Sequence, residues 1–125
     1  MTRKELTGTR DLTFSGWIRA NLPDSYTGFR VSDLDFILWN CKTRSLMLLE
    51  VKTRGKKMAK WQSSLFCVLD MLIKKGLPDV TPPIHYKGFH CVRFIKTWFD
   101  DGVCMLNKKQ VTEKQLMKFL SMKEP

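Results

Sequence analysis

Apolar and polar residues alternate with two different periods along this chain, and the changes of period separate strands from helices. Short apolar runs predict strands over residues 35–39 and 46–51, and the polar break between them predicts a hairpin turn. A repeat of three to four residues predicts a helix over residues 58–75. Both strands are apolar on both faces, which is typical of a sheet covered on two sides and therefore of an α/β fold.

The rest of the chain gives weaker or shorter signals. Near-helical spacing over residues 12–22, followed by Pro23, predicts an N-terminal helix, and residues 26–31 are interpreted as a short strand. Residues 89–98 predict a long strand after a loop over 79–87, with a return strand over 103–106. A last helix is expected where Thr112 and Gln115 can form a capping box.

The length of 125 residues fits a single domain spanning residues 1–125. The longest apolar runs are far shorter than a membrane span, so no membrane partner is expected. The N-terminus has no apolar stretch typical of a signal peptide. The expected compartment is therefore the cytoplasm, or the host cytoplasm if the chain is viral.

The formal net charge of +10 indicates a polyanionic partner, most often nucleic acid, although solubility alone is the alternative explanation. The distribution is more informative than the total, because residues 42–60 carry about +6 of the charge. This basic segment surrounds the only acid-x-Lys sequence in the chain, which is Glu50-Val51-Lys52.

Glu50 and Lys52 point to the same face of a strand, because side chains alternate along it. If the hairpin turns about Thr43-Arg44, residue i pairs with residue 87 − i, and Asp35 lies opposite Lys52. The three side chains then converge on one patch. Asp33 has the same parity and pairs two residues further out.

Two carboxylates and a main-chain carbonyl are oxygen ligands of the kind that Mg²⁺ prefers. Asp35, Glu50 and the carbonyl of Val51 are the candidate ligands, and Lys52 is the candidate for orienting a metal-bound water and stabilising phosphorane charge. This pattern indicates metal-assisted phosphodiester hydrolysis. The alternative is a buried Asp35–Lys52 salt bridge without a metal.

Ser32-Asp33-Leu34-Asp35, followed after the turn by Glu50-Val51-Lys52, resembles the signature of the PD-(D/E)xK nuclease superfamily. The resemblance covers residues 33–52 closely and the following helix loosely. Leu34 or Ser32 stands where the signature has proline, so either Asp33 or Asp35 is the ligand, and Asp35 is favoured. The resemblance implies a restriction-endonuclease-like αβββαβ core, with a central mixed sheet flanked by helices, and Mg²⁺ or Mn²⁺ as cofactor.

Two further residues are candidates through the same resemblance. Members of the superfamily often carry a Gln or Lys on the helix after the motif strand, and Gln62 takes that place. Some members carry an N-terminal glutamate near the metals, and Glu5 is the only such residue here. A half-exposed Gln62 and a solvated Glu5 are the alternatives.

Four basic residues follow the motif with no acidic residue between them, and they are the predicted contacts to the nucleic-acid backbone: Arg54, Lys56, Lys57 and Lys60. A solvated basic face is the alternative.

Together these features predict a Mg²⁺-dependent DNA endonuclease that cuts branched or structured DNA as a homodimer, as small resolvases of the superfamily do. A flap or single-strand nuclease, a virus-type replication or repair nuclease and a small restriction enzyme are the other enzymatic hypotheses. A non-catalytic nucleic-acid-binding module and a basic protein–protein adaptor are the alternatives outside catalysis.

Overall fold

The structure is a computed structural model that describes residues 12–24 and 27–125. The chain divides into two compact units, Met1–Ser32 and Asp33–Pro125, and each is described by itself. The first unit contains helix α1 (Thr13–Asn21), which confirms the predicted N-terminal helix. The helix ends at Asn21, and the backbone of the following Leu22 is extended because the next residue is Pro23.

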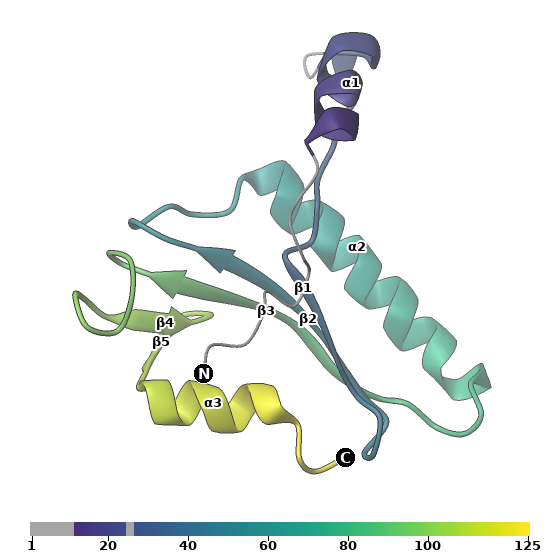
Figure 1. Cartoon of the computed structure of the whole chain (residues 1–125). Helices are drawn as coiled ribbons and strands as arrows, with labels where there is room; N and C mark the ends of the chain where they lie inside the picture. The colour runs from purple at the N-terminus through teal and green to yellow at the C-terminus, as the bar shows by residue number, and fades with distance from the viewer. Residues whose placement is uncertain (1–11, 25–26) are drawn as a thin grey trace. The chain divides into compact units, whose positions relative to one another are not determined.

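The second unit is an α/β arrangement built on a five-stranded mixed sheet with the order β1-β2-β3-β4-β5 (Figure 1). Its elements in chain order are β1 (Phe36–Asn40), β2 (Ser45–Lys52), α2 (Lys60–Gly76), the short 3-10 helix η2 (Leu77–Asp79), β3 (His85–Phe94), β4 (Cys104–Leu106), β5 (Lys109–Val111) and α3 (Glu113–Ser121). The β2 and β3 strands are parallel, and the other neighbouring pairs are antiparallel. The parallel pair requires a crossover, which α2 provides.

Several predicted boundaries are wrong. Residues 27–31 form no strand, and Tyr26 lies outside the described residues. The β3 strand begins at His85 within the predicted loop, because Ser45 of β2 pairs with His85. It ends at Phe94, four residues early, because the side chain of Asp101 binds the backbone of the next segment. The short strand β5 was missed, since two of its three residues, Lys109 and Gln110, are polar and carry no apolar signal.

The predicted hairpin is confirmed, but its register is shifted by two residues. Phe36 pairs with Leu49 and Asn40 with Ser45, so residue i pairs with residue 85 − i. The side chain of Asn40 closes the turn by accepting hydrogen bonds from the backbone N–H groups of Lys42 and Thr43 at 3.0 and 3.3 Å. A shift of two preserves the parity of every side chain, so the predicted faces survive.

The two helices of this unit cover opposite faces of the sheet. Phe89 and His90 are adjacent in β3 and point to opposite sides. Phe66 of α2 packs on Phe89, with ring centroids 4.6 Å apart, and Phe119 of α3 packs edge-on against His90 at 4.9 Å. The main buried cluster lies on the α3 face and includes Leu49, Val92, Phe94, Cys104 and Leu116. The α2 face carries the predicted site.

Helix α2 is less buried than its apolar pattern predicts, and even Leu69, one turn from Phe66, is exposed. Gln62 and Phe66 are buried, whereas Leu65, Val68 and Leu72 are exposed.

Among the residues described, none belongs to a helix with the length and hydropathy that crossing a bilayer requires. The α3 helix begins with the predicted capping box between Thr112 and Gln115.

Candidate functional site

The carboxylate of Asp35 is fixed at the point where β1 begins. Its Oδ2 atom accepts a hydrogen bond of 2.8 Å from the backbone N–H of Val51. Phe36 and Leu49 form the outermost pair of β1 and β2. Asp35 directly precedes Phe36, so it lies across from Glu50, the residue that follows Leu49. The main chain of the motif strand therefore holds Asp35 against the motif.

Glu50 is the most deeply buried acidic residue of the site, with 3% of its surface exposed. Burial, followed by a hydrogen-bond contact with Asp35 and the negative charge of Asp35, raises the pKa of Glu50 from 4.5 to about 8. Lys52 opposes this shift through its positive charge, and its Nζ atom lies 4.0 Å from Oε1 of Glu50. The carboxyl groups of Asp35 and Glu50 thus share one patch, and the ammonium group of Lys52 is only just close enough to form an ion pair with Glu50.

The expected placement of Asp35 directly opposite Lys52 is wrong, because the hairpin register differs by two residues from the prediction. Lys52 approaches Glu50 of its own strand instead. Asp35, Glu50 and Lys52 nevertheless gather on one patch, as the unchanged parity requires. Asp33 is exposed and contributes a smaller upward effect to the pKa of Glu50, so it lies at the margin of the same patch.

Strand β3 brings two more side chains to this face. Cys91 pairs with Glu50, and Arg93 pairs with Lys52. Burial raises the pKa of the Cys91 thiol, and the charge of Glu50 raises it further. The carboxyl ends of the two parallel strands therefore place a carboxylate, a thiol, an ammonium and a guanidinium side by side.

Two buried side-chain atoms in the described part of the chain lack a hydrogen-bond partner, and both belong to this site. They are Oε2 of Glu50 and Nε of Arg93. An unpaired buried polar atom costs about 1–3 kcal/mol, and more when the group is charged. One orphaned acceptor and one orphaned donor on neighbouring strands are suited to a bound cation and a bound anion.

Gln62 is buried near the start of α2 and faces the sheet, so the half-exposed alternative is wrong. Along this helix, Asp70 accepts a 2.7 Å hydrogen bond from Tyr86, and Phe66 contacts Phe89. One further turn toward the helix N-terminus extends this progression to Gln62, above the part of β3 that contains Cys91. The helix thereby directs Gln62 toward the strand segment beside Glu50.

The donor set fits a divalent cation of the magnesium type. Asp35 and Glu50 supply carboxylate oxygens, and one oxygen of Glu50 is buried without a partner. Within residues 12–24 and 27–125 no three His, Cys, Asp or Glu side chains come together to hold a metal. The carbonyl of Val51 and water molecules would complete the coordination, in keeping with the small protein share typical of Mg²⁺ sites.

The predicted nucleic-acid contacts lie just beyond this patch. Arg54, Lys56, Lys57 and Lys60 are all exposed. Arg54 adopts a left-handed backbone conformation, with a φ of 55° that is uncommon for a residue other than glycine. Its backbone N–H donates to the carbonyl of Lys96 at 2.6 Å, and the N–H of Gly55 donates to Phe94 at 3.3 Å. These bonds join the loops that follow β2 and β3.

Arg93 and Lys96 are site residues that the sequence did not reveal. Arg93 reaches the site because it pairs with Lys52, which lies about forty residues earlier in the chain. Lys96 reaches it through the hydrogen bond between its carbonyl and the N–H of Arg54. The one available signal was the basic side chain of Arg93 between the apolar residues Val92 and Phe94. Glu5, the predicted accessory glutamate, lies outside the described residues.

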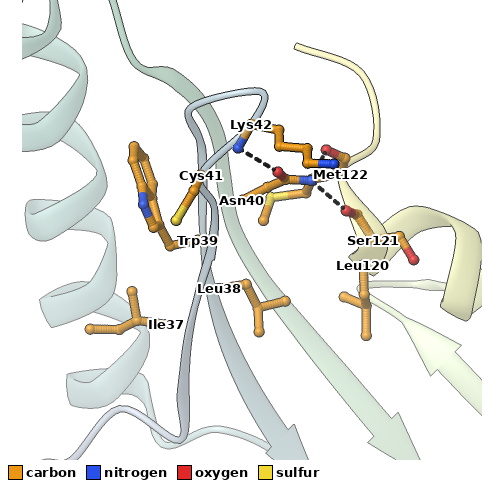
Figure 2. Close-up of a pocket in the computed structure, with 9 residues that line it drawn as sticks. All are labelled: Ile37, Leu38, Trp39, Asn40, Cys41, Lys42, Leu120, Ser121 and Met122. Atoms are coloured by element: carbon orange, nitrogen blue, oxygen red, sulfur yellow. Dashed lines mark hydrogen bonds between the residues drawn. The ribbon is translucent and has the colours of Figure 1, made fainter.

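A separate open hollow of about 510 Å³ lies between β1 and the C-terminal end of α3 (Figure 2). Figure 2 shows Leu38 and Leu120 facing each other there, while Ile37 and Trp39 point to the other side of the strand. Asn40 ties the two elements together by donating to the carbonyls of Ser121 and Met122. None of the residues that line this hollow belongs to the carboxylate patch.

Comparison of the chain with protein-family models, with curated proteins and with solved structures returned no match.

Proposed function

We propose that the chain is a metal-dependent DNA endonuclease of the PD-(D/E)xK type. One observation carries this proposal. The two described buried polar atoms without partners, Oε2 of Glu50 and Nε of Arg93, both lie near the carboxyl ends of the parallel strands β2 and β3, close to Asp35 and Lys52. A divalent cation and a phosphodiester anion are a matched pair of ligands for these two atoms.

Asp35 and Glu50 would hold Mg²⁺ or Mn²⁺, with the carbonyl of Val51 as a third ligand. When bound, the metal supplies an acidified water and neutralises charge on the phosphate. Binding would also displace the proton that the raised pKa of Glu50 retains, because carboxylate ligands bind metals in their ionised form.

Lys52 and Arg93 act on the phosphate side of the site. Lys52 can donate to the attacking water or to a nonbridging oxygen, where charge accumulates in the transition state. The planar guanidinium of Arg93 is suited to bind phosphate oxygens through two parallel hydrogen bonds. Gln62 supports the site from α2, whose first turn faces this part of the sheet.

The arrangement of elements supports the family proposal in part. Residues 36–94 supply a ββαβ order, with the acidic residue before one strand and the E-x-K sequence on the next. The implied αβββαβ core has another strand before these two. No strand precedes β1 among residues 27–35, and β1 is at the edge of the described sheet rather than central.

The basic residues at the carboxyl ends of β2 and β3 favour recognition of the nucleic-acid backbone. With no separate recognition module in residues 33–125, structured DNA remains the proposed substrate, with flap and single-strand cleavage as the alternatives. The second candidate function is nucleic-acid binding without catalysis. It is favoured by the same basic loops and needs no metal.

The decisive experiment is a cleavage panel with Mg²⁺ or Mn²⁺ that compares four-way junctions, flaps, single strands and linear duplex. The wild-type protein should cut at least one form, and Glu50→Ala and Lys52→Ala should each abolish cutting while retaining their circular dichroism spectra. Lys108→Ala, which removes an exposed charge in the turn before β5, is the matched control and should cut normally. Full activity in either site variant contradicts the catalytic assignment, and DNA binding without any cutting supports the second candidate.

A further inference from the structure

The loop after β3 presents an aromatic side chain to solvent beside the proposed site. Trp98 has 50% of its surface exposed. Its ring stacks on Phe94, with centroids 5.0 Å apart and planes inclined by 24°, and it meets Phe99 edge-on at 5.2 Å. Phe94 is part of the buried cluster. One side of the Trp98 ring is therefore supported by the core, and the exposed half remains accessible.

The position of this ring is fixed by its own loop. Oδ1 of Asp101 accepts hydrogen bonds from the backbone N–H groups of Thr97 and Trp98 at 3.1 and 2.9 Å. Its other carboxylate oxygen accepts a hydrogen bond from the Thr97 hydroxyl. A ring that is already ordered loses little conformational entropy when a planar ligand stacks on it.

Two basic residues, Lys96 and Arg54, flank Trp98 on its N-terminal side, while Asp100 and Asp101 follow it in the same loop. Lys96 is two residues before Trp98, and its carbonyl accepts the hydrogen bond from the N–H of Arg54. Both side chains are exposed. Arg93 and Phe94 are consecutive in β3 and point to opposite faces, so Trp98 lies at the same edge of the sheet as the site but against its other face. A strand leaving the site across this edge would pass the basic loop after β2 and Lys96 before it reaches Trp98.

We propose that Trp98 stacks on an unpaired base of the bound DNA, with Arg54 and Lys96 contacting the adjoining phosphates. The inference rests on the proposed nuclease function and specifies its substrate class as DNA with unpaired nucleotides beside the cut. In an intact duplex both faces of each internal base are already stacked on neighbours. An aromatic ring flanked by cations is the usual combination in single-strand binding, where stacking contributes about 1–3 kcal/mol per base.

Trp39 provides a matched control for this assignment. It is exposed to a similar extent, at 43%, but it lies in β1 and the guanidinium of Arg44 covers its ring at 5.6 Å. Unlike Trp98, it does not lie in the loop that the Asp101 carboxylate holds or that is hydrogen-bonded to Arg54. Removing it should therefore change exposed aromatic area without changing the stacking site.

The test measures binding in EDTA, by fluorescence anisotropy, to a labelled single strand of about 15 nucleotides and to a blunt duplex of the same length. Trp98→Ala should weaken single-strand binding by about five-fold or more, the loss expected for one stacked base, with little change for duplex. Trp98→Phe should retain most of the affinity, and Trp39→Ala should bind both as wild type does. Equal losses for both forms, or no loss with Trp98→Ala, would overturn the proposal.

A second measurement does not depend on the folding of the variant. Abasic sites placed one at a time in the single strand remove a base while leaving its phosphate. One position should weaken wild-type binding by about the same factor as Trp98→Ala, and the two changes together should cost no more than one. Losses that are uniform over all positions would contradict a single stacking site.

Cleavage measured with the same proteins separates this inference from the nuclease assignment. Trp98-dependent binding without metal-dependent cutting would reject the nuclease assignment and the substrate class while leaving a stacking site. Cutting that depends on Lys52, together with single-strand binding that is indifferent to Trp98, would reject the inference alone.

Discussion

At the scale of single residues, the site is defined by charges that are imperfectly balanced. Glu50 is buried beside Asp35, and Lys52 reaches it only at 4.0 Å. Arg93 has a guanidinium nitrogen that is buried without a partner. Both imbalances would be relieved by ligands of opposite charge, so these residues are expected to affect ligand binding and stability in opposite ways.

Replacing Arg93 tests its contribution to phosphate binding. Arg93→Ala is expected to lower the cleavage rate by about 100-fold, the scale of losing one preorganised donor to a developing negative charge. Arg93→Lys should recover part of this loss, since it retains the charge but not the planar fork. Single-turnover kinetics with saturating protein provide the measurement. A rate equal to that of Lys108→Ala would remove Arg93 from the site.

The raised pKa of Glu50 predicts how stability depends on pH in the absence of metal. Because the folded state holds this proton up to a pKa of about 8, against an ordinary value of 4.5, the free energy of unfolding should fall as pH rises between those values. Glu50→Gln cannot lose a proton, so in EDTA its stability advantage over wild type should grow from pH 5 to pH 8. Urea titrations measure the difference, and a constant difference across this range contradicts the prediction.

At the scale of elements, α2 is attached to β3 through a polar contact as well as an aromatic one. Asp70 accepts a hydrogen bond of 2.7 Å from the Tyr86 hydroxyl, and it forms an ion pair with the ammonium group of Lys74 at 2.8 Å. Burial opposes the ionised form of Asp70, but the hydrogen bonds from Lys74 and Tyr86 outweigh it and lower the pKa. The contact aligns α2 and therefore positions Gln62.

Tyr86→Phe should lower the free energy of unfolding by about 1 kcal/mol, the usual net value of one hydrogen bond. The lowered pKa of Asp70 gives the sign of the pH effect. This stabilisation should be present above pH 4 and should be lost as acid protonates the carboxylate. Chemical denaturation of both proteins in steps from pH 7 down to pH 2 tests this, and a difference that stays constant over the whole range would exclude the ionised Asp70 as the cause.

At the scale of the whole molecule, the proposed homodimer has a candidate surface. Strand β1 exposes Ile37 on the side of the sheet where α2 runs, and α2 exposes Leu65, Val68 and Leu72 (Figures 1 and 2). In the described sheet β1 pairs with β2 alone. An apolar edge strand of this kind is suited to pairing with a second copy of the chain.

Sedimentation equilibrium should therefore give twice the chain mass of 14.7 kDa for the wild-type protein. Ile37→Glu should shift the equilibrium to monomer, because it places a charge on the apolar surface. Met117→Glu on α3 is the control, since Met117 is exposed to nearly the same extent, at 63% against 65%. A monomeric wild type, or equal effects of both substitutions, would reject this interface.

The sequence by itself determined the local features of this protein. Period-two and helical patterns predicted the hairpin, α2, β4 and the capped α3, because these elements depend on near neighbours along the chain. Parity alone brought Asp35 to the face of Glu50 and Lys52, even though the predicted register was wrong by two residues. The site's acidic centre could thus be predicted from twenty residues.

The tertiary structure decided what surrounds that centre. The parallel pairing of β2 with β3 placed Arg93 beside Lys52, and the hydrogen bond from the Arg54 N–H to the Lys96 carbonyl joined the loops that follow these two strands. It also left several apolar side chains of α2 exposed, and it presented Trp98 at the edge of the sheet where the site lies. None of this follows from local periodicity, because the register of strands separated by a crossover helix depends on packing across the whole sheet.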